Sequence, residues 1–398
     1  MSYPKIILHR HRVAALERRH PWLFSGAIQR AEGKPTEGSV VDVFTPDNQY
    51  VATGHFQAGG SIAVRLLSFK QVPIDVGFWT QKIAAAYQYR KQLGLDQVSA
   101  ATNVFRLVNA EGDGLPGLII DYYHGTAVVQ MHTWGMYNAK NDICEALKNV
   151  LGNYLHAIYH KSAETLPKIN AHEAVQNGYL WGMTAVPSVV TENHNRFAID
   201  WETGQKTGFF IDQRLNRQLL AQYAQGKTVL NAFSYSGGFS VYALVAGALQ
   251  VDSVDVSQKA IDLCNQNVAL NNFDSLQHQA ICDDVLKYLQ HNTTPYDIVV
   301  LDPPAFAKHI DSRHKAVQGY KRLNVLGLKN VKPGGILFTF SCSAVVDRQL
   351  FYDTIVAAAI EVGRNVRVMH HLSQPPDHPV SIYHTEGHYL KGLVLYVE

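Results

Sequence analysis

The stretch Val229-Leu-Asn-Ala-Phe-Ser-Tyr-Ser-Gly-Gly-Phe-Ser240 predicts a strand, a tight turn and the start of a helix. Residues 229–232 fit a short buried strand, and residues 239–249 fit a helix with small and apolar faces. The turn between them has almost no side chains, so a ligand could touch its backbone. In open parallel sheets, ligands bind at such turns, outside the carboxyl ends of the strands. An ordinary strand-to-helix turn is the alternative interpretation of Gly237 and Gly238.

Three more apolar segments of strand length follow at 253–256, 298–301 and 335–341, and helical segments separate them. This alternation predicts an α/β domain with a doubly wound, mainly parallel sheet and right-handed crossovers. The apolar segment 389–397 follows a proline-rich loop, and we expect it to close the sheet as an antiparallel C-terminal strand.

The first two hundred residues predict two smaller domains. Residues 40–44 and 50–53 flank a turn and fit a hairpin of a small β-barrel. Trp22 and Phe24 are expected to pack into the core of this barrel. Strands and helices then mix in a central α+β region. The predicted domains are therefore residues 1–72, 73–200 and 201–398.

Asp255 ends the second strand of the C-terminal domain, where a carboxylate could hydrogen-bond a ribose. It could instead cap the next helix, but Ser257 is the better cap for residues 258–270, which leaves Asp255 without a structural role. The dinucleotide fingerprint and the phosphate-binding loop motif are both absent. A glycine pair preceded by a tyrosine suits a cofactor with an adenosine and no phosphate, such as S-adenosyl-L-methionine (SAM).

Two strand tips carry candidate catalytic groups. Asp302 is followed by two prolines, which fix the backbone where a planar base could dock; a rigid strand exit is the alternative. Cys342 ends the next strand, where an isolated cysteine is ordinarily a small buried hydrophobe. A Cys342 thiolate could attack C6 of a pyrimidine, and C5 would then take the methyl group of SAM. This role implies a thiol pKa below the usual value of roughly 8.5, and Asp302 could stabilise charge developing at N3.

The bulk composition predicts a cytoplasmic protein without a membrane span. The 35 Lys and Arg residues nearly balance the 33 Asp and Glu residues, and no apolar run reaches membrane length. The four cysteines have no paired or metal-binding spacing, which suits a reducing compartment and predicts no metal. A basic N-terminus and a second basic run after Asp302 favour a polyanionic substrate, although either run alone fits a solvated surface.

Several motifs occur together and in the same order as in one known family. They are His20-Pro-Trp-Leu-Phe-Ser-Gly26, Asn109-Ala-Glu-Gly-Asp-Gly-Leu-Pro-Gly117, Gly204-Gln-Lys-Thr-Gly-Phe-Phe-Ile-Asp-Gln-Arg-Leu-Asn-Arg217, Asn231-Ala-Phe-Ser-Tyr-Ser-Gly-Gly-Phe239, Leu301-Asp-Pro-Pro-Ala-Phe306 and Phe340-Ser-Cys-Ser343. With them the chain resembles, over nearly its whole length, the bacterial PUA-domain methyltransferases that form 5-methylcytosine in 23S ribosomal RNA. The resemblance implies a PUA-like RNA-binding domain at the N-terminus, a Rossmann-like class I SAM methyltransferase domain at the C-terminus, and a homodimer.

The resemblance also extends the set of candidate site residues. It implies that Asp284 lies near the adenine, a role that Asp283 could exchange with it, and that Gln213 and Arg214 lie near the cofactor or the RNA. Asp212 fits an N-cap equally well. The predicted cofactor-binding residues are Asn231, Phe233, Tyr235, Ser236, Gly237, Gly238, Asp255, Val256, Asp283, Asp284, Asp302 and Gln213. The predicted RNA-binding residues are Pro303, Pro304, Phe306, Lys308, Arg214, Arg10, Arg12, Arg18 and Arg19.

Two other functions fit the same motifs. Methyltransferases acting on exocyclic amines, guanine N2 or adenine N6, also use an acidic or amide residue before Pro-Pro, and they need no cysteine. A non-catalytic RNA-binding assembly factor could bind SAM structurally. Other RNA cytosine-C5 methyltransferases carry a second cysteine in the strand-four motif. Here Pro304 and Ala305 occupy that region, so the sequence does not identify the base that removes the C5 proton.

Overall fold

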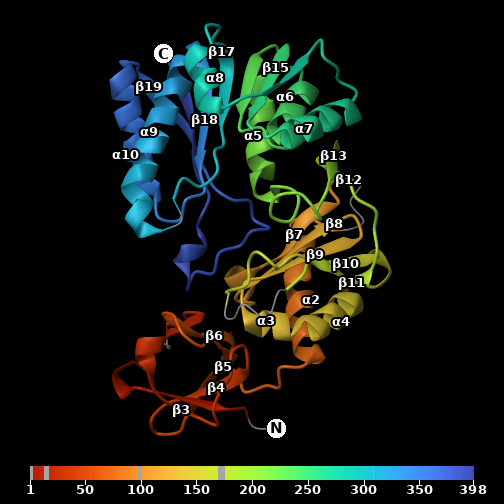
Figure 1. The fold of residues 1–398 in the computed structure, drawn as a ribbon, viewed down its shortest axis with the longest axis vertical. Coiled ribbons are helices and arrows are strands. Elements are labelled where there is room, and N and C mark those ends of the chain that lie inside the picture. Colours follow the sequence, from red (N-terminus) through yellow and green to blue (C-terminus); the bar gives the residue numbers. More distant parts are fainter. Residues whose placement is uncertain (1–2, 13–17, 97–100, 169–174, 308) are drawn as a thin grey trace. The chain divides into compact units, whose positions relative to one another are not determined.

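The computed structural model describes residues 3–12, 18–96, 101–168, 175–307 and 309–398 (Figure 1). The chain forms two compact units, and each consists of segments that are distant in sequence. Unit 1 comprises residues 1–190, 199–211 and 376–387; unit 2 comprises residues 191–198, 212–375 and 388–398. In the described part of the chain, no helix has both the length and the apolar character that crossing a membrane requires.

Unit 2 is built on a seven-stranded sheet with the order β16-β15-β14-β17-β18-β20-β19 (Figure 1). Its strands are β14 (Thr228–Ala232), β15 (Gln250–Asp255), β16 (His278–Cys282), β17 (Tyr296–Leu301), β18 (Val331–Ser341), β19 (Val366–Leu372) and β20 (Lys391–Val397). The first five strands pair in parallel, and β20 runs antiparallel to both β18 and β19. The predicted doubly wound sheet with an antiparallel C-terminal strand is confirmed.

Six helices accompany these strands. They are α5 (Arg214–Ala224), α6 (Gly238–Val245), α7 (Gln258–Leu270), α8 (Val285–His291), α9 (Arg313–Lys329) and α10 (Arg348–Val362). Side chains from the central strands and from α8, α9 and α10 form one core, which includes Leu230, Val299 and Leu323. The predicted helix 239–249 is too long, because the chain turns at Gly247 with a φ of 86° soon after α6 ends.

Unit 1 contains a six-stranded and a five-stranded sheet. The first consists of β1 (Lys5–Leu8), β2 (Trp22–Phe24), β3 (Ile28–Glu32), β4 (Val40–Phe44), β5 (Tyr50–Phe56) and β6 (Ile62–Ser68). Strands β4 and β5 form the predicted antiparallel hairpin. The prediction that Phe24 is a core residue is wrong, since 46% of it is exposed. Its neighbour Leu23 takes the inward position, because successive side chains on a strand point to opposite faces.

The five-stranded sheet and its helices share a separate apolar core. The strands are β7 (Val104–Asn109), β8 (Leu118–Tyr123), β9 (Thr126–Met131), β10 (Ala157–His160) and β11 (Gly178–Gly182). The helices are α2 (Val76–Gln92), α3 (Trp134–Asn138) and α4 (Lys140–Leu151). Trp79, Phe105 and Leu147 are among the side chains buried between them. Strands β12 (Ser188–Glu192) and β13 (Asn195–Ile199) then form a two-stranded sheet.

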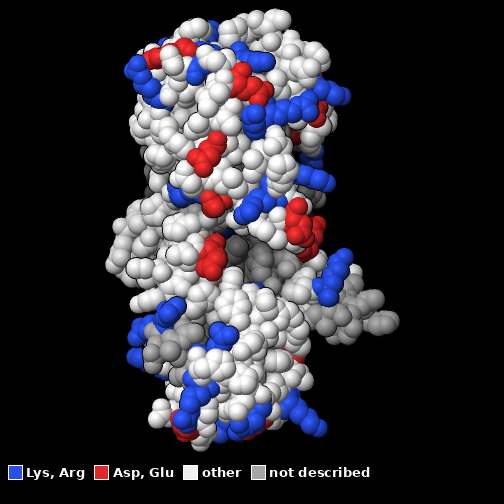
Figure 2. Space-filling model, turned by 90° about the vertical axis from the view of Figure 1, so that its left-hand side faces the viewer, with Lys and Arg blue, Asp and Glu red and all other residues white. Residues whose placement is uncertain are grey.

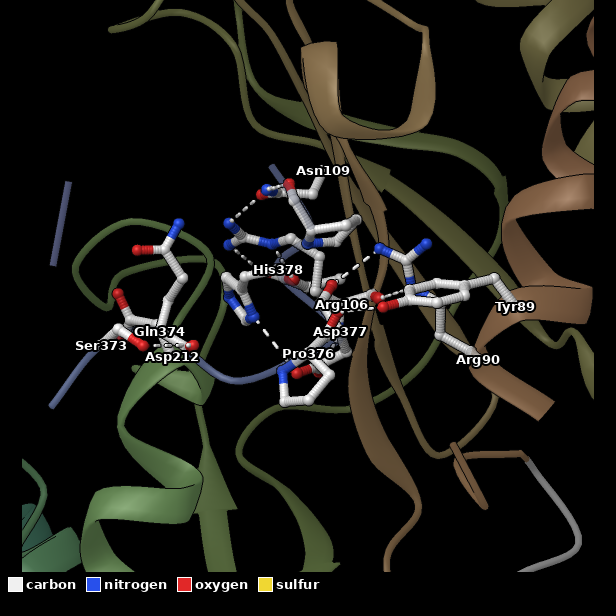
Figure 3. Close-up of polar contacts among 12 residues, drawn as sticks. Tyr89, Arg90, Arg106, Asn109, Asp212, Ser373, Gln374, Pro376, Asp377 and His378 are labelled. Carbon is white, nitrogen blue, oxygen red and sulfur yellow. Dashed lines mark hydrogen bonds and ion pairs between the residues drawn. The ribbon is translucent and has the colours of Figure 1, made fainter. Parts of the chain in front are cut away.

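Residues 376–387 return from the C-terminal part of the chain to pack into unit 1. The fully buried guanidinium of Arg90 donates to the Asp377 carbonyl oxygen at 2.7 Å (Figure 3). It also binds the carboxylate of Asp113. The Arg106 amide donates to the Asp377 carboxylate at 3.1 Å, and the Asn109 side chain donates to the Pro379 carbonyl oxygen at 2.9 Å. Helix α2 and strand β7 therefore hold a segment that lies nearly three hundred positions later in the chain.

Candidate active site

The predicted site residues of unit 2 gather at one edge of its sheet. Strands β14, β15, β16, β17 and β18 are parallel, so their carboxyl ends share that edge. The glycine-rich loop follows β14, Asp255 ends β15, Asp302 follows β17 and Cys342 follows β18. Ligands of doubly wound folds bind at this edge, and the structure makes it the candidate site.

The loop between β14 and α6 has a strained backbone that requires glycine at one position. Phe233, Tyr235 and Gly237 have φ angles of 62°, 43° and 75°. The Gly237 amide donates to the Ser234 carbonyl oxygen at 2.8 Å, which closes the turn. A Cβ atom at Gly237 would lie 2.5 Å from the sulfur of Cys264, so both the conformation and the space exclude a side chain.

Asp255 supports this loop, and the prediction that it has no structural role is wrong. Its Oδ2 accepts a hydrogen bond from the Tyr235 amide at 3.0 Å, and its Oδ1 accepts from the Ser257 amide at 3.0 Å. Ser257 caps α7, as predicted, by accepting from the Ala260 amide. The spacing of residues in the sequence did not show that the backbone amides of Tyr235 and Ser257 lie next to the carboxylate at the end of β15.

Buried polar atoms beside β14 fit a ligand. Asn231 donates through Nδ2 to Ser240 Oγ at 2.8 Å. The Oδ1 atom of Asn231 and the Oγ atom of Ser234 are both buried, and neither finds a hydrogen-bond partner within the described residues. A buried polar atom left without a partner is destabilising. The hydroxyl and ammonium groups of a SAM molecule are suitable partners for these two oxygens.

The predicted cofactor residues after β15 and β16 are more exposed. Asp284 caps α8 by accepting from the Lys287 amide at 2.9 Å, and Asp283 accepts from the Asp284 amide at 2.7 Å. Both carboxylates lie at the surface of the same edge, together with Val256, which is 71% exposed. Each of the two carboxylates therefore already accepts one hydrogen bond from a nearby backbone amide.

Asp302 lies among polar side chains from the start of α5. Desolvation raises the pKa of the Asp302 carboxyl to about 7; the charge of Asp212 adds to this rise, while a hydrogen bond from Gln213 and the charge of Arg217 oppose it. Although Asp302 keeps some exposure at the rim, its carboxyl group is largely desolvated. Near pH 7 a substantial fraction of it is therefore neutral and can donate a hydrogen bond.

Asp212 is not the N-cap of α5, because Gln213 directly precedes the helix. Asp212 lies in the short 3₁₀ turn η5 (Ile211–Gln213) and accepts from the Tyr389 hydroxyl at 2.7 Å. Gln213 and Arg214 are buried. The buried position of Arg214 suits a contact inside the site better than a contact with an RNA surface.

Cys342 is partly exposed at the rim, whereas Cys144 and Cys264 are buried. The segments that follow β17 and β18 are connected through Ser343. Its Oγ atom accepts from the Ala307 amide at 3.4 Å and lies 3.0 Å from the Tyr320 hydroxyl. These contacts hold the Asp302-Pro-Pro segment next to the segment that carries Cys342.

Lys391 is a residue of this site that the sequence alone did not reveal. It opposes Ser341 across the β18–β20 pair, and its Nζ atom donates to the Ser343 carbonyl oxygen at 2.7 Å. Desolvation lowers the pKa of Lys391 to about 8, although the charge of Cys342 opposes this shift. The residue lies nearly fifty positions from Cys342, and only the antiparallel pairing brings the two together.

The predicted substrate residues after β17 differ in exposure. Pro303 is buried and Pro304 is exposed. The ring of Phe306 lies 4.6 Å from the ring of Tyr320, centroid to centroid. Lys308 lies outside the described residues.

Arg10, Arg12, Arg18 and Arg19 are exposed in unit 1. Arg10 forms an ion pair with Asp47 at 2.7 Å, and both side chains are largely solvated. Figure 2 shows many Lys and Arg side chains and few acidic ones on the visible face of the N-terminal region. This distribution suits contact with phosphates.

An open cleft of about 500 Å³ lies elsewhere in unit 2, between the first turns of α9 and α10. Its lining includes Arg313, His314, Asp347 and Asp353. None of the predicted cofactor residues lines it, so the rim of the sheet remains the candidate site.

Comparison with known proteins shows the family of the chain. Residues 173–391 match the model of a family described as S-adenosylmethionine-dependent methyltransferase, and residues 6–69 match a PUA-like domain. The chain is 39% identical over 394 residues to "Ribosomal RNA large subunit methyltransferase I" of Alteromonas mediterranea, covering 98% of each chain. It is 38% identical to the protein of the same name from Aeromonas hydrophila, again covering 98% of each.

Solved structures share the fold. A protein of Streptococcus mutans, described provisionally as a SAM-dependent methyltransferase, is 24% identical with a TM-score of 0.83 and full coverage of both chains. A similar methyltransferase structure in complex with S-adenosylhomocysteine is also 24% identical, with a TM-score of 0.84 and full coverage of both chains. At this identity the likeness concerns the fold.

Proposed function

Because the chain belongs to the SAM-dependent methyltransferase family whose members include ribosomal RNA large subunit methyltransferase I, we propose that it methylates C5 of a cytidine in 23S ribosomal RNA. SAM is the cofactor, and it supplies an electrophilic methyl group. The specific claim is the position of methylation. The observation that carries it is the partly exposed Cys342, held beside the Asp302 segment through Ser343.

In this proposal Cys342 attacks C6 of the target cytosine as a thiolate. Attack at C6 makes C5 nucleophilic, a property that an unactivated pyrimidine ring does not have. Lys391 places a positive charge near the sulfur and favours the thiolate, since a nearby cation lowers the pKa of a thiol.

The neutral fraction of Asp302 serves as a hydrogen-bond donor. Its carboxyl has a pKa raised to about 7, so it can donate to N3 of the cytosine as negative charge develops there during attack. Phe306 and the two prolines follow Asp302 in the chain, and in this proposal they border the planar base.

The RNA substrate is supported by two features. The N-terminal PUA-like match includes exposed arginines, and the curated relatives are named for modification of large-subunit ribosomal RNA. We infer that the N-terminal arginines bind phosphates while the rim of the unit 2 sheet binds the target base. The predicted homodimer and the predicted domain limits remain predictions.

The test is incubation of the purified chain with SAM and unmodified 23S ribosomal RNA, followed by mass spectrometric mapping of the methylated nucleotide. We expect one 5-methylcytidine. Cys342→Ala should lower the methylation rate by about three orders of magnitude or more, because it removes the nucleophile, while SAM affinity stays within a few fold. Cys144→Ala is the matched control: this cysteine is buried in α4 of unit 1, and the variant should methylate normally.

RNA containing 5-fluorocytidine tests the covalent step separately, because the fluorine blocks release from the enzyme. The wild type should form an adduct that survives denaturing electrophoresis, and Cys342→Ala should form none. Methyl transfer to an exocyclic amine, with normal turnover by Cys342→Ala, would contradict the cytosine-C5 proposal. Absence of any methyl transfer to ribosomal RNA would favour the assembly-factor alternative.

A further inference from the structure

Three metal-ligating side chains meet in unit 1, apart from the methyltransferase site. They are His20, His384 and Glu386, and their ligand atoms all lie within 4.8 Å of one another. His20 Nε2 and His384 Nε2 each lie 3.8 Å from a carboxylate oxygen of Glu386. His20 precedes β2, while the other two belong to the returning segment 376–387.

The two ring nitrogens of His384 are buried without hydrogen-bond partners in the described part of the chain. Only 4% of the residue is exposed. A buried imidazole without partners is destabilising, because folding removes its hydrogen bonds to water and replaces none of them. Its Nε2 atom faces the Glu386 carboxylate at a distance too long for a hydrogen bond.

We propose that His20, His384 and Glu386 bind one divalent transition-metal ion, Zn²⁺, which attaches the returning segment to the N-terminal sheet. Two imidazole nitrogens and one carboxylate oxygen form a three-ligand zinc set, and water completes the tetrahedron. The ion satisfies the otherwise unpartnered Nε2 atom of His384. This proposal does not depend on which RNA position the protein methylates.

The distances suit an ion after small side-chain movements. Ligand atoms on one tetrahedral zinc ion are about 3.4 Å apart, given bond lengths of about 2.0–2.2 Å. The 3.8 Å separations join His20 to Oε1 and His384 to Oε2 of Glu386, and one ligand atom from each residue lies within 4.8 Å of the others. The three atoms must therefore approach one another by up to about 1.4 Å to bind one ion. Glu386 is the ligand best able to move, since its side chain is 54% exposed. The exposure of Glu386 and part of His20 also gives the ion a route from solvent.

Backbone groups of Trp22 orient the His20 imidazole. His20 Nδ1 lies 3.2 Å from the Trp22 carbonyl oxygen, and donation to it leaves the Nε2 lone pair for the metal. A metal-bound histidine usually donates its other N–H to such an acceptor. In the metal-free chain the Trp22 amide, 3.1 Å from the same nitrogen, competes for it, so metal binding selects one tautomer.

Trp22 forms a wall of the cluster. Its ring centroid lies 4.4 Å from that of His384, and its Nε1 atom donates to Glu111 at 2.8 Å. Arg65 is the nearby cation, and its ion pair with Glu111 at 3.2 Å offsets its charge. The cluster therefore keeps a net attraction for a cation through Glu386.

The buried network around Arg90 fixes the segment that carries two of the ligands. Figure 3 shows the Arg90 guanidinium directed at Asp377, only seven residues before His384. The Tyr89 hydroxyl adds a bond to the Pro376 carbonyl oxygen at 3.0 Å. A support of this kind is what a metal site requires, because ligands held in place lose little entropy on binding.

The experiment uses the full chain, treated with a chelator, exchanged into metal-free buffer and titrated with zinc chloride against a chromophoric competitor. We expect one zinc ion per chain. Glu386→Gln keeps the side-chain shape and should lower zinc affinity at least about tenfold, as should His384→Ala and His20→Ala. Zinc should also raise the melting temperature of the wild type more than that of Glu386→Gln at the same zinc concentration.

A second histidine pair provides the control. His9 and His11 are stacked with ring centroids 5.4 Å apart near the N-terminus, and they could bind zinc adventitiously. His11→Ala should leave zinc affinity unchanged. Cobalt chloride should give the visible absorption of tetrahedral Co²⁺ with the wild type and with His11→Ala, but not with Glu386→Gln.

Equal zinc affinity in wild type and Glu386→Gln would overturn the proposal, as would loss of binding in His11→Ala alone. If His384→Ala fails to fold, as judged by circular dichroism, the zinc affinity of Glu386→Gln still tests the proposal, because Glu386 is exposed. Methylation of ribosomal RNA is not the readout, so failure of the cytosine-C5 proposal leaves this test intact.

Discussion

Two aspartates on either end of one strand have opposite electrostatic surroundings. Asp302 follows β17, and desolvation raises the pKa of its carboxyl to about 7. Asp297 is near the start of β17; burial raises its pKa, but hydrogen bonds from Thr228 and Lys332 outweigh burial and lower it below the usual value. The same substitution at the two positions should therefore have opposite effects on stability.

Asp302→Asn should stabilise the protein at neutral pH. In the wild type the unfolded chain ionises near the ordinary value of 3.8 and the folded chain near 7, so the folded state binds more protons in this window. The contribution of Asp302 to the free energy of unfolding therefore decreases as the pH rises from about 4 to about 7. Above pH 7 this contribution does not change further. The gain in Asp302→Asn should reach a few kcal/mol at pH 7, since one pKa unit is about 1.4 kcal/mol. Urea unfolding at pH 4 and pH 7 measures it.

Asp297→Asn is the matched control for that measurement. Because the folded-state pKa of Asp297 is lowered, its ionised form stabilises the fold above the unfolded pKa, and this contribution disappears as the pH falls below it. The variant should therefore be less stable than the wild type at pH 7. A gain of stability in both variants would mean that removal of charge alone explains the result.

Lys391→Met should slow the alkylation of Cys342 by iodoacetamide at pH 7. The lysine has a pKa of about 8, so it is charged below that pH and favours the thiolate. We expect a decrease of about fivefold or more, because even a well-screened charge pair at close range is worth about 1 kcal/mol. Mass spectrometry measures the rate peptide by peptide.

Exposed Cys282 is the internal standard of that experiment, and its alkylation rate should not change. Lys391→Arg keeps the charge and should restore most of the Cys342 rate. If Lys391→Met alkylates Cys342 at the wild-type rate, the lysine does not activate the thiol.

At the scale of strands and helices, the sequence predicted the centre of the sheet and missed its edges. Strands β14 and β17 are largely buried on both faces and appear as apolar runs such as Ile298-Val-Val-Leu301. The edge strands β16 and β19 have mainly polar or exposed residues, among them His370 and His371. Without an apolar run or clear alternation they gave no strand signal.

The candidate site was predictable to a similar extent. Asp302 and Cys342 directly follow apolar strands, so their position at the rim follows from the local pattern. Lys391 and the hydrogen bonds of Asp255 depend on pairing between distant or looped segments. His20 and His384 lie far apart in the sequence, and the proposed metal site contains no cysteine. The spacing of the cysteines therefore could not predict it.

Gly237→Ala should disrupt the loop before α6. The φ of 75° costs an alanine about 1–2 kcal/mol, and the contact with Cys264 adds about 1–3 kcal/mol of overpacking. SAM affinity should also fall, because the loop belongs to the proposed cofactor site. Thermal unfolding and calorimetric titration with SAM measure the two effects.

Gly363 offers a matched control at the end of α10. It has a φ of 66°, and a Cβ atom there meets no described heavy atom within 4 Å. Gly363→Ala should cost only the backbone contribution and leave SAM affinity unchanged. Equal losses of stability in the two variants would rule out the packing contribution at Gly237.

At the scale of the whole molecule, RNA affinity should depend steeply on salt. If 6–10 phosphates are contacted, affinity should fall by about three to five decades between 50 and 200 mM salt. The double variant Arg18→Gln/Arg19→Gln should reduce the slope of log affinity against log salt by about two. Filter binding with ribosomal RNA fragments measures the slope.

Lys329→Gln controls for loss of charge in general, since this exposed lysine ends α9 and lies outside the basic N-terminus. It should keep the wild-type slope. A slope close to zero in the wild type would show that phosphate contacts do not dominate binding.

The hydrogen bond between Arg90 and Asp377 constrains how the protein folds during translation. A ribosome adds about 5–20 residues per second, so roughly 15–60 s separate the synthesis of these two residues. Throughout that interval helix α2 lacks the carbonyl oxygen that finally receives the buried guanidinium. The N-terminal half therefore cannot finish folding during translation before the C-terminal half has been synthesised, and a prematurely terminated chain would expose an incomplete core to proteases and chaperones.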